Sequence, residues 1–156
     1  MLNCVFEDGA QVLLRHVTAD TIIIKDGKIL LVKRTGKLLE SGKWALAGGF
    51  MDRDETIAEA ATREVMEETG WKIKDLTLLR INDRPNRPME DRQNIEFVHF
   101  ATAIEKIGKA DAESSEQKWF DLDKLPPAEE IAFDHADNIE LYKKYLKTPF
   151  GLPVIG

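Results

Sequence analysis

The chain has 156 residues, 43% of them hydrophobic and 32% charged, and this balance predicts a single globular domain spanning residues 1–156. Its formal net charge of −6 and its pI near 5.2 exclude the broad basic surface that long nucleic acids require. A single cysteine excludes an internal disulfide, and no stretch approaches the roughly 18 apolar residues of a membrane span. We therefore expect a cytoplasmic protein, and a phosphorylated small molecule stays open as its ligand.

The N-terminal part of the chain is expected to form strands. Their ranges are 12–15, 20–24 and 28–34. Asp26-Gly27 is typical of the tight turn of a β-hairpin, and the apolar run that follows it favours a strand buried on both faces. Lys33 and Arg34 end this strand, and either they are solvated or they lean toward a phosphate of a ligand. A loop without periodicity follows and leads to the paired glycines Gly48 and Gly49, which allow a ligand to approach the backbone closely.

Residues 56–69 have the signals of a helix. Thr56 and Glu59 form a capping box, and Gly70 supplies a C-terminal stop. Small apolar side chains recur on one face, which is expected to pack inward. They are Ile57, Ala60, Ala61 and Val65.

Three glutamates continue this inward face. Glu64 and Glu68 fall on the same arc and Glu67 lies at its edge, although like charges one turn apart repel and anions oppose the dipole at a helix C-terminus. No lysine lies one turn away, and Arg63 lies on a flank from which it reaches Glu67 or Glu59 and not all three acids. A divalent metal, Mg²⁺ or Mn²⁺, is the compensating charge that carboxylate oxygens favour. The alternative is an acidic helix face in solvent.

The spacing of charged residues and glycines from 49 to 71 resembles the Nudix box. The matching positions are Gly49, Glu55, Arg63, Glu64, Val65, Glu67, Glu68 and Gly70. Ala47 stands where a proline often precedes the glycine pair, and Trp71 stands where an aliphatic residue is common. The resemblance implies an α/β protein with the Nudix fold, a mixed β-sheet sandwiched between α-helices.

The same resemblance implies roles for individual residues. Glu64, Glu67 and Glu68 would hold the metal together with the backbone carbonyl of Gly49, and Arg63 would hold the glutamates in position. Glu55 supports the ligand helix in the family, and we group it with the candidates for substrate binding. The complete set of candidates for substrate binding is Arg34, Arg84, Arg87 and Glu55.

Beyond the box, segments 72–81 and 94–104 are expected to form strands, with His99 a satisfied histidine of the sheet. Between them lies a polar loop whose arginines either clamp a diphosphate or are simply solvated. They are Arg84, Arg87 and Arg92. Pro85, fifteen positions after Gly70, is similar to the proline that marks ADP-ribose pyrophosphatases in the Nudix family.

A charged stretch, 105–118, precedes a late strand that begins at Trp119. In Nudix relatives a glutamate of this region reaches the metal site as a ligand or general base; Glu113 and Glu116 are the candidates here, and we choose Glu116. Residues 134–147 have the pattern of an amphipathic helix. The apolar tail after it is expected to pack on the domain or on a second subunit, which leaves a homodimer open.

The resemblance implies metal-dependent hydrolysis of a nucleoside diphosphate linked to another group, with ADP-ribose or a similar nucleotide sugar as the expected substrate. A nucleoside triphosphate pyrophosphatase, including one that removes oxidised nucleotides, is the alternative enzyme. A nucleotide sensor that does not cleave its ligand is a third hypothesis, although sensors of this kind carry a degenerate box fused to a DNA-binding domain. An isomerase of the isopentenyl diphosphate type is disfavoured because Cys4 lies far from the box.

Overall fold

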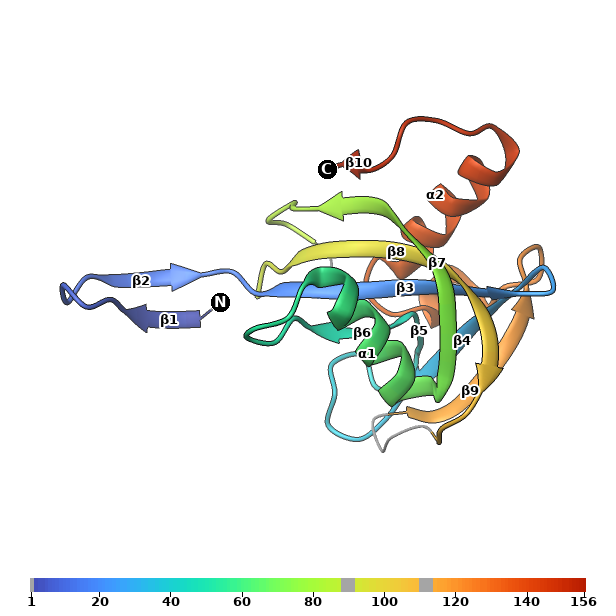
Figure 1. The fold of residues 1–156 in the computed structure, drawn as a ribbon, viewed down its shortest axis with the longest axis horizontal. Coiled ribbons are helices and arrows are strands. Elements are labelled where there is room, and N and C mark those ends of the chain that lie inside the picture. The colour runs from blue at the N-terminus through green and yellow to red at the C-terminus, as the bar shows by residue number, and fades with distance from the viewer. Residues whose placement is uncertain (1, 88–91, 110–113) are drawn as a thin grey trace.

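The structure is a computed structural model, and it describes residues 2–87, 92–109 and 114–156. Figure 1 shows the arrangement of its elements along the chain. In order they are β1 (Leu2–Val5), β2 (Gln11–Leu14), β3 (Val17–Lys25), β4 (Lys28–Arg34), β5 (Trp44–Ala45), β6 (Ala47–Phe50), α1 (Ile57–Thr69), β7 (Trp71–Asn82), β8 (Ile95–Lys106), β9 (Ser114–Asp121), the 3₁₀ helix η1 (Ala128–Glu130), α2 (His135–Lys147) and β10 (Val154–Ile155).

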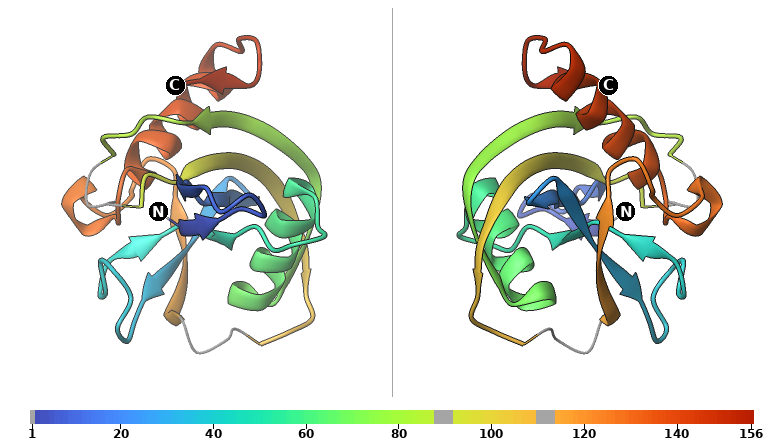
Figure 2. Two further views of the ribbon diagram at one scale, coloured as in Figure 1. Left: turned by 90° about the vertical axis from the view of Figure 1, so that its left-hand side faces the viewer. Right: turned by 90° about the vertical axis from the view of Figure 1, so that its right-hand side faces the viewer.

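In the described residues, eight strands form one mixed sheet with the order β10-β7-β8-β3-β4-β5, to which β6 adds beside β3 and β9 beside β4. β3 runs parallel to β8 and antiparallel to β4 and β6. Figure 2 shows α1 inside the curve of β7 and β8, and α2 outside it on the other face of the sheet. The expected fold class, a mixed sheet between helices, is confirmed.

Alternate side chains of the central strands build two cores. Ile22, Ile29 and Leu31 pack on the α2 side, whereas Ile23 and Leu30 pack on the α1 side. Since all five are 2% exposed or less, β4 is buried on both faces, as its apolar run predicts. The sheet therefore gives the loop and helix between β6 and β7 a rigid base.

The expected helices and strands are observed with shifted ends, but β1, β5 and β6 were not expected, and β2 pairs with β1 outside the main sheet. Residues 114–118, expected to precede the late strand, belong to β9, because β9 pairs with β4 along its whole length. The tail forms β10, which packs on the domain as a parallel partner of β7. His99 lies in β8 and is 4% exposed, and burial lowers its pKa. In the described part of the chain, no helix is long and apolar enough to cross a membrane.

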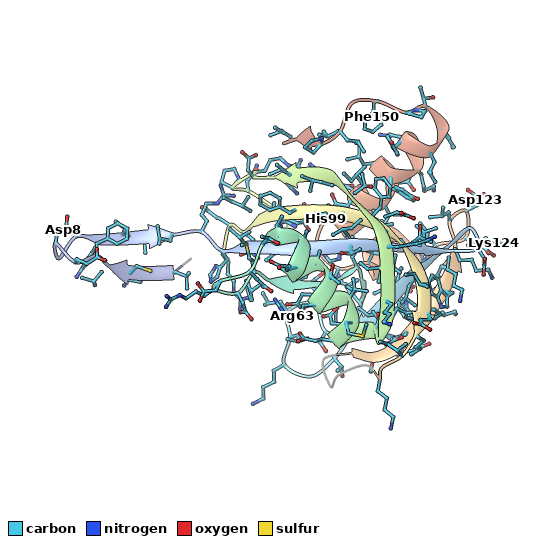
Figure 3. The ribbon with its side chains drawn as sticks, in the orientation of Figure 1. Asp8, Arg63, His99, Asp123, Lys124 and Phe150 are labelled. Atoms are coloured by element: carbon cyan, nitrogen blue, oxygen red, sulfur yellow. The ribbon has the colours of Figure 1, made fainter. Side chains whose placement is uncertain are left out.

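The hairpin formed by β1 and β2 stands away from the rest of the fold. Asp8 marks its tip in Figure 3, far from the helices and the main sheet. Cys4 lies in β1 and is half-buried. At the base of the hairpin, Arg15 donates to the backbone carbonyls of Asp83 (2.7 Å) and Asn94 (3.3 Å) and to that of Gln93. These bonds connect the start of β3 to the polar loop between β7 and β8.

Candidate metal site and the buried cluster behind it

The start of α1 is fixed by its own sequence. The Thr56 hydroxyl accepts from the Glu59 N–H (3.3 Å), and the Glu59 carboxylate accepts from the Thr56 N–H (2.7 Å), which completes the expected capping box. Gly70 ends the helix with φ 72°, and its N–H donates to the Met66 carbonyl. The helix therefore presents its glutamates at fixed positions beside β6.

Arg63 connects most of the charged residues of the box, and Figure 3 labels it on α1. Its guanidinium donates to both oxygens of Glu55 (2.7 and 3.1 Å), to Glu64 (2.7 Å) and to Glu67 (3.1 Å). Hydrogen bonds first from Arg63 and then from the Asp52 backbone lower the pKa of Glu55. The hydrogen bonds to Glu55, Glu64 and Glu67 raise the pKa of Arg63. The expectation for Arg63 needs correction, because it contacts Glu64 as well as Glu67, and Glu59 is engaged in the helix cap.

The three glutamates differ in exposure. Glu68 is 7% exposed, and the side chains of Glu64 and Glu67 are 14% and 53% exposed. The exposed fraction thus rises from Glu68 to Glu64 to Glu67, as the positions of the three glutamates on the helical arc predict. We call Glu55, Glu64, Glu67, Glu68 and Arg63 the outer cluster.

The glycine pair lies against two of these carboxylates. The Gly48 N–H donates to Glu68 Oε2 (3.0 Å), so it does not donate to β3. A Cβ built on Gly49 would lie 2.6 Å from Glu64 Oε1. Glycine is therefore required at 49 for the carboxylate to lie against the strand.

The direction of these backbone groups favours the carbonyl of Gly48 as a metal ligand, in place of the expected carbonyl of Gly49. In an antiparallel pair, the N–H and C=O of one residue point to the same side. Because the Gly48 N–H points toward Glu68, its carbonyl also points away from β3, and Gly49, opposite Ala19, is the residue that bonds with β3. The Phe50 carbonyl agrees with this alternation, since it accepts from Arg63 (3.0 Å). We therefore assign the backbone ligand to Gly48 in place of Gly49.

The outer cluster suits a divalent cation. Together with the Gly48 carbonyl it offers carboxylate and carbonyl oxygens, the donors that Mg²⁺ and Mn²⁺ prefer, and Glu67 is half-exposed. Arg63 already holds these side chains in place, as an outer-shell partner of metal ligands does.

The expected substrate-binding arginines lie in different surroundings. Arg34 donates to the Leu39 carbonyl (2.8 Å), and its guanidinium covers the Phe133 ring at 5.0 Å. Arg84 has a half-exposed side chain and donates to Asn82 (3.3 Å). Arg87 is 8% exposed and faces the interior, so we withdraw the expectation that it clamps a diphosphate. Glu55 is engaged by Arg63, which fits support of the helix and not contact with substrate.

A similar correction applies to the expected general base. Gln117 Nε2 donates to the carbonyls of Glu68 (3.0 Å) and Thr69 (3.2 Å), so Gln117 faces α1. Because successive side chains of a strand point to opposite faces, Glu116 points away from α1, and we assign it no role in the reaction. The other candidate, Glu113, lies outside the described residues.

Behind the glycine pair lies a second group of charged residues that the sequence analysis missed. Asp20, Glu96 and Asp134 are each 8% exposed or less. Arg87 donates to both oxygens of Asp134 (2.6 and 3.0 Å) and lies 3.0 Å from Glu96 Oε1. We call these four residues, together with His135, the inner cluster.

The inner cluster touches the segment that carries the glycine pair. His135 Nδ1 accepts from the Leu46 N–H (3.0 Å), two residues before Gly48. A Cβ built on Gly48 would lie 2.5 Å from Asp20 Oδ1. The loop is therefore held from one face by the outer cluster and from the other by the inner cluster.

Burial determines the protonation of the inner cluster. It raises the pKa of Asp20, as does the neighbouring Glu96 carboxylate, and it raises the pKa of Glu96 against the opposing charge of Arg87. Burial would also raise the pKa of Asp134, but the hydrogen bonds and charge of Arg87 lower it. Burial lowers the pKa of His135 to about 3, so its ring is neutral.

The side chains of Asp20, Glu96 and His135 bring potential metal ligands within 4.8 Å of one another. Two observations count against a cation there. Since His135 Nδ1 accepts a hydrogen bond, the proton of the neutral ring lies on Nε2, the atom that faces both carboxylates at 3.8 Å. Arg87 already supplies a positive charge beside Glu96. The outer cluster is therefore the better candidate for the metal.

Comparison with known proteins agrees with this fold and site. The model of the NUDIX domain matches residues 14–142. An ADP-ribose pyrophosphatase of Methanocaldococcus jannaschii is 39% identical over 132 residues, which cover 83% of this chain and 73% of that protein. An oxidized purine nucleoside triphosphate hydrolase of Danio rerio is 32% identical over 107 residues, which cover 67% of this chain and 65% of that protein.

Among solved structures, an ADP-ribose pyrophosphatase of Streptococcus suis superposes with a TM-score of 0.74 at 21% identity, over 92% of this chain and all of that one. This likeness concerns the fold. The chain belongs to the Nudix family, because the family model covers most of its length and the outer cluster occupies the positions of the Nudix box.

Proposed function

We propose that this Nudix hydrolase cleaves the diphosphate of a nucleoside diphosphate linked to a sugar, with ADP-ribose as the leading substrate, at a Mg²⁺ site formed by the outer cluster. The observation that carries the proposal is the joint placement of Glu64 against Gly49 and of Glu68 on the Gly48 N–H, with Arg63 bonded to Glu64 and Glu67. Mn²⁺ is expected to substitute for Mg²⁺.

In the reaction, a water oxygen attacks one phosphorus of the diphosphate and the bridging P–O bond breaks, which yields AMP and ribose 5-phosphate. One carboxylate of the outer cluster takes the proton of the water. When bound, Mg²⁺ supplies Lewis acidity toward the phosphoryl oxygens and the attacking water. Arg63 keeps Glu64 and Glu67 in one orientation, and Glu55 in turn keeps Arg63 in place.

ADP-ribose leads because the archaeal relative that matches most of this chain bears the name ADP-ribose pyrophosphatase, and because Pro85 lies at the position typical of that group. The alternative, a nucleoside triphosphate pyrophosphatase, is supported by the shorter match to the Danio rerio hydrolase. The products distinguish the two: AMP and ribose 5-phosphate in the first case, a nucleoside monophosphate and pyrophosphate in the second.

Glu67→Gln tests the metal site. Its side chain is 53% exposed, so the fold is expected to survive while turnover of ADP-ribose with Mg²⁺ falls about 100- to 1000-fold, the range for loss of one preorganised charge at a reacting centre. Steady-state rates and circular dichroism check this.

Glu59→Gln, on the same helix but engaged in the cap, serves as the control and is expected to retain turnover. Near-normal turnover of Glu67→Gln would refute the assignment, and absence of turnover in the native sequence on every nucleotide would favour a sensor.

A further inference from the structure

An exposed phenylalanine follows the glycine pair of the candidate metal site. Phe50 follows Gly49 at the end of β6 and is 40% exposed. The two other exposed phenylalanines of the described residues, Phe6 and Phe150, lie in the projecting hairpin and after α2. Figure 3 labels Phe150 near the C-terminal end, well away from Arg63. Only Phe50 of the three is therefore placed to contact a substrate held by the outer cluster.

The backbone of Phe50 is hydrogen-bonded to the outer cluster. Its carbonyl accepts from Arg63 Nη2 (3.0 Å), the same guanidinium that bonds to Glu55, Glu64 and Glu67. The next N–H along the chain, that of Met51, donates to the Val17 carbonyl of β3 (3.0 Å). The Phe50 backbone is thus fixed from both sides relative to the carboxylates of the outer cluster.

The ring itself projects to the opposite face of β6 from Glu64. Phe50 pairs with Thr18, so both side chains lie on the α2 side of the sheet, whereas Glu64 lies against Gly49 on the α1 side. A diphosphate at the outer edge of β6 would therefore have the carboxylates on one side and the Phe50 ring on the other. This is the arrangement that a nucleotide needs, with its phosphates on a metal and its base on an apolar surface.

Two further side chains complete the surface around the ring. The His16 ring lies 5.0 Å from the Phe50 ring at an angle of 43°, and the Arg92 guanidinium lies 5.5 Å from its centre. Both come from segments that are held in place, because the Ile95 N–H donates to the His16 carbonyl (2.8 Å) and Arg15 bonds to the carbonyls of Gln93 and Asn94. Arg92 also brings a positive charge to a protein with a net charge of −6.

We propose that Phe50, flanked by His16 and Arg92, is the stacking surface for the nucleobase of the substrate. The inference rests on the proposed function and adds the subsite for the base. Base stacking on an aromatic ring tolerates every base, because each base has a π-face, and a neighbouring guanidinium strengthens binding of an anionic nucleotide. This surface therefore provides affinity for nucleotides over phosphorylated sugars and discriminates weakly between adenine and guanine.

Phe133 is the competing surface. Its ring carries the Arg34 guanidinium at 5.0 Å and the His135 ring at 5.5 Å, and it lies beyond the other end of β6, near Ala45. Phe133 is less exposed than Phe50, and Arg34 already covers one of its faces. Parallel substitutions at positions 50 and 133 decide between the two rings.

The experiment uses Phe50→Leu, Phe50→Trp and Phe133→Leu, with Phe150→Leu as the matched control. Calorimetry with Mg²⁺ measures the affinity for AMP and for ribose 5-phosphate, and a Mn²⁺ titration checks the metal site. Phe50→Leu is expected to weaken AMP about tenfold and to change the affinities for ribose 5-phosphate and Mn²⁺ less than twofold. Phe50→Trp and the two other leucine variants are expected to bind AMP as the native sequence does.

Equal affinity of Phe50→Leu and the native sequence for AMP would overturn the proposal, as would a loss confined to Phe133→Leu. A parallel loss of Mn²⁺ and AMP affinity in Phe50→Leu would indicate a distorted loop and would also count against stacking. The proposed function fails separately, by absence of ADP-ribose hydrolysis in the native sequence. If hydrolysis is present, Phe50→Leu is expected to raise the KM for ADP-ribose about tenfold with kcat changed less than threefold.

Discussion

The outer and inner clusters lie on opposite faces of the same glycine pair, and each combines several carboxylates with one arginine. In the outer cluster the side chain of Glu67 is half-exposed, and Arg63 shares its guanidinium among three acids. In the inner cluster Arg87 is 8% exposed and forms a bidentate pair with Asp134. The outer cluster exposes Glu67 to a cation from solvent, whereas the inner acids obtain their positive charge from Arg87.

We infer that exposure of at least one carboxylate to solvent, and not the number of carboxylates, separates a candidate metal site from a structural ion-pair network. Inside the protein, removing one partner leaves an uncompensated charge that water cannot reach. At the surface, water screens the same loss. The predictions below use this contrast.

The largest effect is expected for Arg87→Met. The substitution leaves Asp134 and Glu96 buried without their cation, so the free energy of unfolding should fall by about 3–5 kcal/mol. Urea denaturation at neutral pH measures the change.

Arg84→Met is the matched control, because Arg84 lies in the same loop but is half-exposed and 3.9 Å from Asp134. Its cost is expected to stay below about 1 kcal/mol. Equal losses in the free energy of unfolding for the two substitutions would show that burial does not set Arg87 apart from Arg84.

A smaller effect, on metal affinity, is expected for Arg63→Lys. A lysine ammonium cannot bond simultaneously to Glu55, Glu64 and the Phe50 carbonyl, so the glutamates lose their common orientation. Mn²⁺ affinity should fall about 10- to 100-fold, as for other outer-shell partners of metal ligands. Calorimetry measures it, with Arg53→Lys, a conservative change at an exposed arginine of the same box, as control. Unchanged Mn²⁺ affinity in Arg63→Lys would place the metal elsewhere.

The smallest effect concerns pH. Burial lowers the pKa of His135 to about 3, so the folded protein binds no proton there at pH 5.5, whereas the unfolded chain, with a pKa near 6.5, does. The stability that depends on neutral His135 is therefore complete above pH 6.5 and is lost as the pH falls toward 3. Between pH 7.5 and 5.5, the free energy of unfolding of His135→Asn should fall by about 1 kcal/mol less than that of the native sequence, as measured by urea denaturation. An identical loss in both proteins would mean that His135 is protonated in the fold.

The outer cluster could be predicted from sequence because its members lie within one helix and the loop before it. Helical periodicity alone placed Glu64 and Glu68 inward and Glu67 at the edge, and the exposed fractions follow that order. The inner cluster could not be predicted in this way. Asp20, Glu96 and His135 meet only because β3 pairs in parallel with β8 and α2 begins beside them.

A signal for the inner cluster was nevertheless present. Asp20 lies between Ala19 and Thr21 in β3, just before a run of three isoleucines, and a carboxylate in a central strand requires a partner. The burial of Arg87 could not be predicted for the same reason, since a loop arginine was expected to clamp a diphosphate or lie in solvent, and its partner, Asp134, is 47 residues away. The spacing of the box could not decide between the carbonyls of Gly48 and Gly49. The direction of each carbonyl depends on strand pairing, which the spacing does not show.

The hydrogen bonds that hold β10 in place bear on where an affinity tag should be joined for the experiments above. Arg80 donates to the Gly156 carbonyl (2.6 and 3.0 Å), and the Gly156 N–H donates to the Ile81 carbonyl (2.9 Å). An affinity tag joined after Gly156 would lie beside this clasp, which also includes a bond from Arg80 to Asn138 (3.0 Å). A tag joined ahead of β1 would instead lengthen an arm that already extends into solvent, and is the better choice for purification.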